Sequence, residues 1–145
     1  MRVGRICVIG CVAAACLWAA EVPDRLADLK SKAEKHDPAD RGRSYSEIAN
    51  YLTDVARNQF NAGDSEKAQA TLKEMIYYVR KAADSAKMKK KGIKETELSL
   101  REVDLRLDGL SHALLSEDRE AIKPMTAEIR QIRKELRDVM FAKKK

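Results

Sequence analysis

The chain contains few residues whose types and spacing could carry out chemistry. Histidine occurs only at His36 and His112. Asp108 and His112 stand four residues apart, which places them on one face of a helix, where they could supply two ligands to a metal ion. A lone pair of this kind is more often an exposed ion pair, so we predict no metal site from it.

Motifs for the common reaction classes are absent from the sequence. A Ser, Cys or Thr nucleophile needs an adjacent base, and no Gly-Xaa-Ser-Xaa-Gly turn occurs to present a serine. Ala33 and Gly109 stand three positions before the two histidines, so the Glu-Xaa-Xaa-His pairs of di-iron bundles do not occur. Neither a haem-attachment motif nor a glycine-rich phosphate loop is found. We therefore expect no catalytic residue and no cofactor.

The first twenty residues have the pattern of a secretory signal peptide. Arg2 and Arg5 precede an uncharged stretch over residues 6–20, and an acidic residue follows at once. This stretch is shorter than the roughly 20 residues that a helix needs to cross a bilayer, which disfavours a permanent anchor. We expect cleavage after Ala19 or Ala20 and export to the periplasm or the extracellular space.

Two alternatives to plain cleavage stay open. Residues 13–16, Ala-Ala-Ala-Cys, resemble a bacterial lipobox, in which Cys16 becomes the lipidated first residue and tethers the protein to a membrane. An uncleaved leader would anchor the chain instead. A membrane contact is therefore expected only through Cys16 or through the leader.

The mature chain must hold itself together by packing. Cleavage at Ala19 or Ala20 removes all three cysteines, which leaves neither a disulfide nor a thiolate metal site. Of the 29 basic residues 27 remain against 23 acidic residues, a net charge of +4 that calls for no nucleic-acid partner. The chain is 36% charged and 5% aromatic, which favours helices with polar outer faces over strands.

Apolar residues recur at helical spacing along the body of the chain. A short accessory helix is predicted over residues 21–37. A second helix is expected from Pro38 to about Asn61, with Asp37 as its N-cap and Gly42 weakening its first turns. Its apolar stripe and those of the helices after it supply the predicted core: Tyr45, Ile48, Leu52, Val55, Ala68, Leu72, Met75, Val79, Ala82, Ala86, Ile93, Leu100, Val103, Leu107, Leu110, Leu114, Ile122, Met125, Ile129, Ile132, Leu136 and Val139.

Three further helices are predicted over about 65–87, 93–114 and 116–139. Gly63 can take the left-handed conformation that ends a helix, and Asp64 and Ser116 are expected N-caps. Pro124 predicts a kink in the last helix, or a restart near Lys123. Ion pairs of Glu97 with Arg101 and of Glu102 with Arg106 are expected on one helix. Short connections then favour an all-α, antiparallel four-helix bundle over residues 38–145, with the short N-terminal helix added.

One face of the helix over residues 93–114 is expected to need a second partner. Leu98 and Leu105 point nearly opposite the main apolar stripe, on the same line as His112. The accessory helix is the favoured cover, because it belongs to the same chain, and another copy of the protein is the alternative. These three residues are the candidate interaction residues.

A basic cluster surrounds the connection before that helix. We expect its lysines to be solvated helix ends, where the terminal carbonyl groups favour cations. Attraction to anionic surfaces is the alternative, and three more lysines close the chain at 143–145. The cluster consists of Lys87, Lys89, Lys90, Lys91 and Lys94.

Residues 51–75 resemble the central part of a tetratricopeptide hairpin. The likeness rests on residues 63–68, Gly-Asp-Ser-Glu-Lys-Ala, with Leu52, Val55 and Ala56 before them and Leu72 after them. The resemblance implies a helical hairpin from a family whose concave surface holds peptides or partner proteins. No second unit follows at the 34-residue period, so we expect a single hairpin inside a bundle.

The sequence thus predicts an exported, non-catalytic helical bundle that acts in protein interaction or envelope scaffolding. Its partner would be another protein or a second copy of the chain. Two other functions stay open, namely a small-molecule or metal-binding bundle and an electrostatic binder of anionic envelope surfaces.

Overall fold

The computed structural model describes residues 13–90 and 92–142. Cys7, Cys11, Lys91 and the tail lysines at 143–145 lie outside them, and so do the side chains of residues 13–22, which include Cys16. Most of the predicted signal peptide therefore falls outside the described residues.

Within these residues the fold is all-helical, as the sequence predicts, and contains no strand. Short connections separate the helices, and a 3-10 turn precedes the second one. The elements are α1 Ala13–Glu34, η1 Pro38–Asp40, α2 Gly42–Asn61, α3 Ser65–Lys89, α4 Ile93–Ala113 and α5 Ser116–Phe141.

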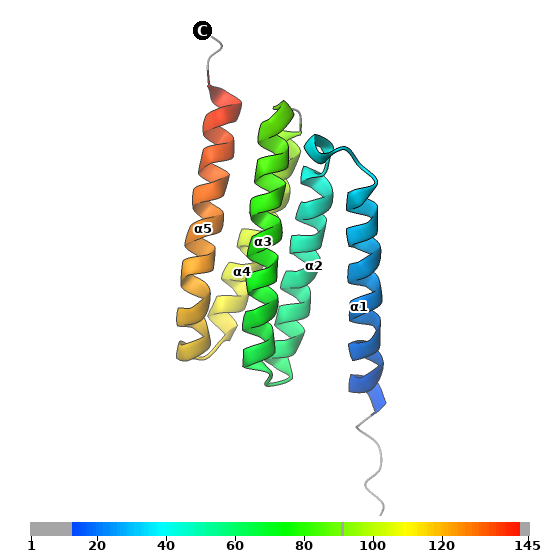
Figure 1. Ribbon diagram of the computed structural model, residues 1–145. Helices are drawn as coiled ribbons and strands as arrows, with labels where there is room; N and C mark the ends of the chain where they lie inside the picture. Colours follow the sequence, from blue (N-terminus) through cyan, green and yellow to red (C-terminus); the bar gives the residue numbers. More distant parts are fainter. Residues whose placement is uncertain (1–12, 91, 143–145) are drawn as a thin grey trace, which may run out of the picture.

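Helices that follow one another in the chain run antiparallel, as Figure 1 shows. Around the core, α2 packs against α3 and α4, and α5 packs against α4 and α3. Because α2 and α4 run in the same direction, as do α3 and α5, two of these packed pairs are parallel. Consecutive helices are antiparallel, as predicted, and the prediction did not include these two parallel pairs. Short connections fix the relative direction of consecutive helices, but they do not fix which other helices become neighbours.

The core consists of the apolar stripes that the sequence marks. Leu72, Met75, Leu100, Leu107 and Leu136 have no exposed surface, and the smaller stripe residues are buried beside them. Stripe residues near the helix ends, such as Leu114 and Val139, are half-buried against this cluster. One continuous apolar cluster therefore joins α2, α3, α4 and α5.

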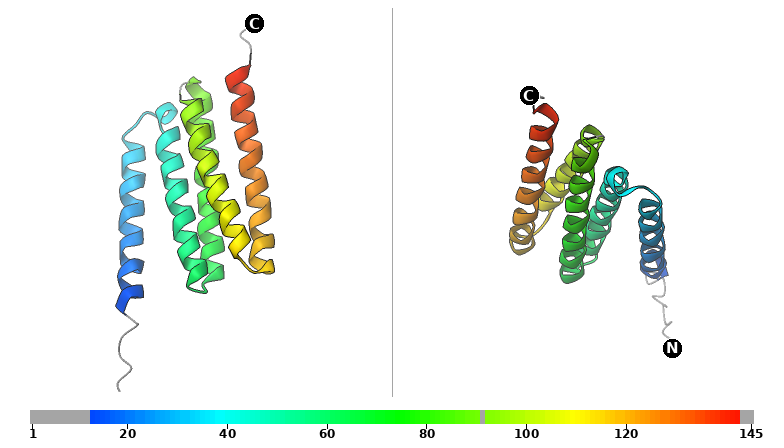
Figure 2. Two further views of the ribbon diagram at one scale, coloured as in Figure 1. Left: turned by 180° about the vertical axis from the view of Figure 1, so that it is seen from behind. Right: turned by 45° about the horizontal axis from the view of Figure 1, so that its top comes forward.

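The accessory helix α1 is longer than predicted and packs beside α2. It runs without a break through Pro23, and its Ala33 is fully buried. Lys30 donates to Glu74 of α3 at 2.8 Å, and Arg25 lies over the ring of Tyr51 at 5.2 Å. In the view from behind in Figure 2, α1 stands at the edge of the bundle away from α5.

Helix α2 begins later than predicted. Pro38–Asp40 forms the separate 3-10 turn η1, and the side chain of Asp37 makes no capping hydrogen bond. Gly42, the first residue of α2, is buried against two other helices. A Cβ atom there would lie 2.9 Å from Thr96 Oγ1 and 3.1 Å from the backbone oxygen of Ala82. The glycine thus permits a close approach, and its role differs from the weakening of a helix that the sequence suggests.

The connections show which local predictions hold. Gly63 has a φ of +83°, the left-handed conformation expected between α2 and α3. Asp64 is the N-cap residue of α3 but makes no side-chain capping bond, and Leu115 rather than Ser116 is the N-cap residue of α5. Helix α5 continues through Pro124, so the predicted restart near Lys123 is wrong.

Among the residues that the structure describes, no helix is both long and apolar enough to span a bilayer.

Candidate interaction surface

Helix α4 has one face in the core and an apolar line on the opposite face. Leu100 and Leu107 are fully buried, whereas Leu98 is 50% exposed and Leu105 is 62% exposed. The left view of Figure 2 shows α4 from outside, with no other helix in front of it. The predicted orientation of Leu98 and Leu105 is therefore confirmed.

The accessory helix does not cover this line. We expected α1 to shield Leu98 and Leu105, but α1 packs beside α2 instead. The apolar stripe of α1 is covered by this packing, because Ala33 is buried and Leu26 and Leu29 pack against the main core. The two leucines of α4 are thus left to solvent in the single chain.

The charged residues around this line differ in whether they have partners. Lys94, Glu95 and Arg101 are exposed and make no ion pair within the described residues. Glu102 contacts Arg106, as predicted from their spacing. The predicted pair of Glu97 with Arg101 does not form, because Glu97 faces α5. Arg101 is consequently an unpaired cation between two exposed leucines.

A buried charged seam joins α4 to α5. Arg133 donates to Glu97 at 2.9 and 3.1 Å and to Asp104 at 2.7 Å. Side-chain exposure is 14% for Arg133, 10% for Glu97 and 8% for Asp104. Arg137 adds a bond to Glu97 at 2.9 Å, and Arg130 adds one to Asp104 at 3.0 Å. Carboxylates this deeply buried are stable as charged groups only with cations in place.

Sequence reasoning missed the seam, although a signal for it exists. Glu97 and Asp104 stand seven residues apart, and three arginines occur at 130, 133 and 137 with spacings of three and four. Each set forms a stripe that borders the apolar stripe of its own helix. The attraction of Asp104, followed by a hydrogen bond to Asp108, raises the pKa of the Arg130 guanidinium.

The pair of Asp108 and His112 lies on the surface of α4. Asp108 Oδ2 is 3.5 Å from His112 Nε2, and the imidazole is 78% exposed. Asp108 also accepts a hydrogen bond from Arg130 at 2.9 Å. No group of three or more potential ligands gathers in the part of the chain that the structure describes. His112 therefore belongs to the outer face of α4, and the sequence interpretation of an exposed ion pair fits the geometry.

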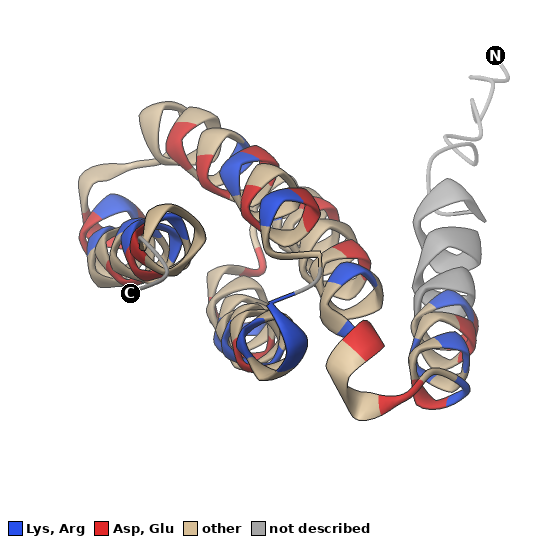
Figure 3. Cartoon of the chain, turned by 90° about the horizontal axis from the view of Figure 1, so that it is seen from above, with Lys and Arg blue, Asp and Glu red and all other residues tan. Residues whose placement is uncertain are grey.

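The basic cluster is partly neutralised by neighbouring acids. Lys87 binds Glu135 at 2.8 Å, and Lys89 lies 3.3 Å from Asp40. The hydrogen bond from Lys87 lowers the pKa of Glu135. Figure 3 looks down on this end of the bundle and shows basic and acidic residues side by side.

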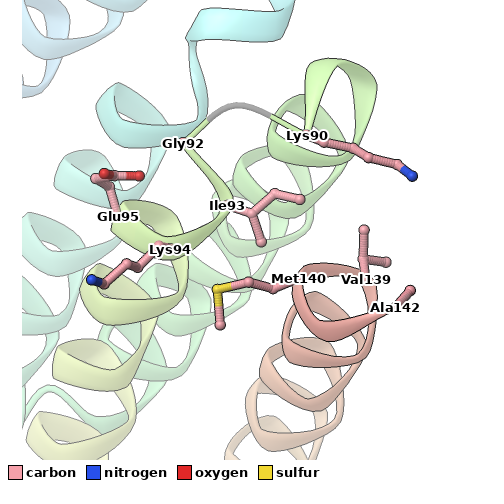
Figure 4. A pocket seen from close by; sticks show the side chains of 8 residues that line it. All are labelled: Lys90, Gly92, Ile93, Lys94, Glu95, Val139, Met140 and Ala142. Carbon is pink, nitrogen blue, oxygen red and sulfur yellow. The ribbon is translucent and has the colours of Figure 1, made fainter. Parts of the chain in front are cut away.

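Two described lysines of the cluster remain without an ion pair, Lys90 and Lys94. They border a shallow pocket of about 250 Å³ between the start of α4 and the end of α5. In Figure 4, Ile93 and Met140 converge in this pocket, while the amine of Lys90 points outward. Ile93, Val139 and Met140 contribute apolar surface to this pocket, so it adds an apolar spot to a weakly basic end.

A wider groove runs over α2, between α1 and α4, with a volume of about 470 Å³. Its charged walls are paired, since Arg43 contacts Glu47 at 3.3 Å and Arg106 contacts Asp54 at 2.6 Å. Asn50 donates to the backbone of Ser46, but its Oδ1 atom is buried and has no hydrogen-bond partner among residues 13–90 and 92–142. Because that oxygen is closed off from solvent, the groove offers a ligand no free group at this position.

Comparisons of the chain with protein-family models, with curated proteins and with solved structures found no match.

Proposed function

We propose that this chain is an exported, non-catalytic protein that binds a protein partner through the outward face of α4. The observation that carries the proposal is the exposure of Leu98 and Leu105, at 50% and 62%, on a helix whose opposite face is fully buried. Large apolar side chains aligned on one exposed helix face are the usual anchor of a helix-mediated contact. Export rests on the basic and then uncharged pattern of residues 1–20.

The other two functions have less support. Space inside the bundle is filled mostly by apolar side chains, and the buried carboxylates Glu97 and Asp104 already bind arginines of α5. Electrostatic attachment would need free cations, and Lys87 and Lys89 already contact acids. The resemblance of residues 51–75 to a tetratricopeptide hairpin favours protein interaction, since that family holds partner proteins.

Site-specific photo-cross-linking in the native host tests the proposal. A photoreactive amino acid replaces Leu98 in one variant, Leu105 in a second and the exposed Lys134 of α5 in a control. We expect discrete protein adducts at the two α4 positions and none at the control. Equal labelling at all three positions, or no adduct at either leucine, contradicts the proposal.

A paired substitution separates binding from stability. Leu98→Glu with Leu105→Glu should leave the unfolding free energy within about 0.5 kcal/mol of the wild type, because both side chains are already exposed. The same variant should lose the adducts formed by a photoreactive group at Gly109, which lies next on this face. Retained adducts would show that the leucines do not hold the partner.

A further inference from the structure

The outward face of α4 repeats its own pattern after seven residues. Residues 94–98 read Lys-Glu-Thr-Glu-Leu, and residues 101–105 read Arg-Glu-Val-Asp-Leu. In each segment a cation and an anion precede the exposed leucine by four and three positions. Seven residues complete nearly two helical turns, so the two leucines form one line along the helix.

The two charges of each segment flank that line on opposite sides. At about 100° per residue, Lys94 and Arg101 lie about 40–60° to one side of the leucines. Glu95 and Glu102 lie by a similar angle on the other side. The face therefore has a basic flank, an apolar centre and an acidic flank at two successive levels.

We propose that the partner of this face is a second copy of the same chain, with the two α4 helices parallel. A twofold axis along the helices brings Leu98 against Leu98 and Leu105 against Leu105. The same rotation turns the basic flank of each copy toward the acidic flank of the other, so Arg101 of one copy faces Glu102 of its mate. Lys94 and Glu95 form the same two contacts one heptad earlier.

The charge pattern selects the parallel arrangement over the antiparallel one. In an antiparallel pair each flank faces itself, which places Arg101 near Arg101 and Glu102 near Glu102. Like charges at close contact repel and are used to exclude wrong pairings. Only the parallel pair places opposite charges together both at Lys94 and Glu95 and at Arg101 and Glu102.

The residues needed for this contact are available. Lys94, Glu95 and Arg101 have no ion pair among the described residues, and the buried seam holds Glu97 away from Arg101. Glu102 has a side chain 54% exposed, and among the described residues its ion-pair partner is Arg106 of its own helix. The two leucines make a small apolar centre, which places the dimer in the weak, transient class of interfaces.

A parallel pair also suits a tethered chain. In Figure 1, α1 begins at the lower end of the bundle and α5 ends at the upper end, and a twofold axis along α4 keeps these ends together. Both copies could therefore hold one membrane through their amino-terminal segments. Tethering to a common surface raises the effective concentration toward the millimolar range, which compensates for a weak contact.

A charge exchange tests the inference, which rests on the proposed function. Arg101→Glu and Glu102→Arg should each weaken self-association at least about tenfold, because each places like charges across the axis. An equimolar mixture of the two variants should associate again, since every Glu then faces an Arg. Lys134→Glu on α5 is the matched control and should associate like the wild type.

Sedimentation equilibrium of the full chain, from about 10 μM to 1 mM, measures the association. Circular dichroism at 222 nm confirms that each variant remains helical. A wild type that stays monomeric over this range overturns the inference, as does a mixture that associates no better than its components. If the chain is monomeric while positions 98 and 105 still cross-link to another protein, the self-association is refuted and the proposed function stands.

Disulfide trapping tests the direction of the pair. In a chain with Cys7, Cys11 and Cys16 changed to serine, Leu98→Cys should oxidise to a dimer by itself, and so should Leu105→Cys. In an antiparallel pair a dimer would form only when the two variants are mixed. That result would overturn the parallel arrangement.

Discussion

Replacing Arg133 by methionine tests whether the charged seam holds α4 and α5 together. The change removes three hydrogen bonds from carboxylates that are 10% and 8% exposed. Such bonds to charged groups contribute about 1.5–3 kcal/mol each. Glu97 keeps Arg137 and Asp104 keeps Arg130, which limits the loss. We expect the unfolding free energy to fall by about 2–4 kcal/mol, toward the range for breaking a buried ion pair.

Urea unfolding followed by circular dichroism at 222 nm measures this loss, and the midpoint should fall with little change in slope. Arg80→Met is the matched control. Arg80 is 59% exposed and, within the part of the chain that the structure describes, pairs with Glu128 alone, so its loss should cost less than about 1 kcal/mol. In a double-mutant cycle, Arg133→Met and Glu97→Gln should couple by at least about 1 kcal/mol. Equal effects of Arg133→Met and Arg80→Met would refute the reasoning.

Three further outcomes are expected. Gly42→Ala should lower the unfolding free energy by about 1–2 kcal/mol, because the added Cβ overlaps neighbouring atoms. At Gly109 an added Cβ meets nothing within 4 Å, so Gly109→Ala should leave the unfolding free energy unchanged or raise it by up to about 1 kcal/mol. Thermal unfolding of both variants compares them. Leu107→Ala should lower the unfolding free energy in urea by about 2–5 kcal/mol, since it opens a cavity at a fully buried position, and a loss under about 1 kcal/mol would argue against a packed core. Lys87 lowers the pKa of Glu135, so this pair stabilises the fold at pH values above the ordinary pKa of glutamate. That stabilisation is lost as the pH falls through the lowered pKa. Carboxyl NMR titration should show the pKa of Glu135 rising in Lys87→Met, and an unchanged pKa would exclude the contact.

Periodicity identified the helices and their inward faces because burial follows the apolar stripe closely. Leu72, Met75, Leu100 and Leu107 are predicted and observed in the core. The turn at Gly63 was equally predictable, since the need for a positive φ is a local property of the backbone. These features depend on residues close in sequence.

The missed features depend on contacts between distant segments. The role of Gly42 arises from the approach of α3 and α4, which no local pattern encodes. Glu97 had an acceptable partner four residues away in Arg101, and only the position of α5 brings it to Arg133 instead. The parallel neighbours α2 and α4 likewise follow from how two hairpins stack, a choice that short connections leave free.

The charged seam also sets the alignment of α5 along α4. A shift of α5 by seven residues, about 10 Å, would still place apolar side chains against apolar side chains, because both stripes repeat at nearly that interval. Arg133 would then lose its contact with either Glu97 or Asp104. One of the two carboxylates would be buried without a cation beside it. The hairpin of α4 and α5 therefore has one register, specified by polar residues rather than by its apolar contacts.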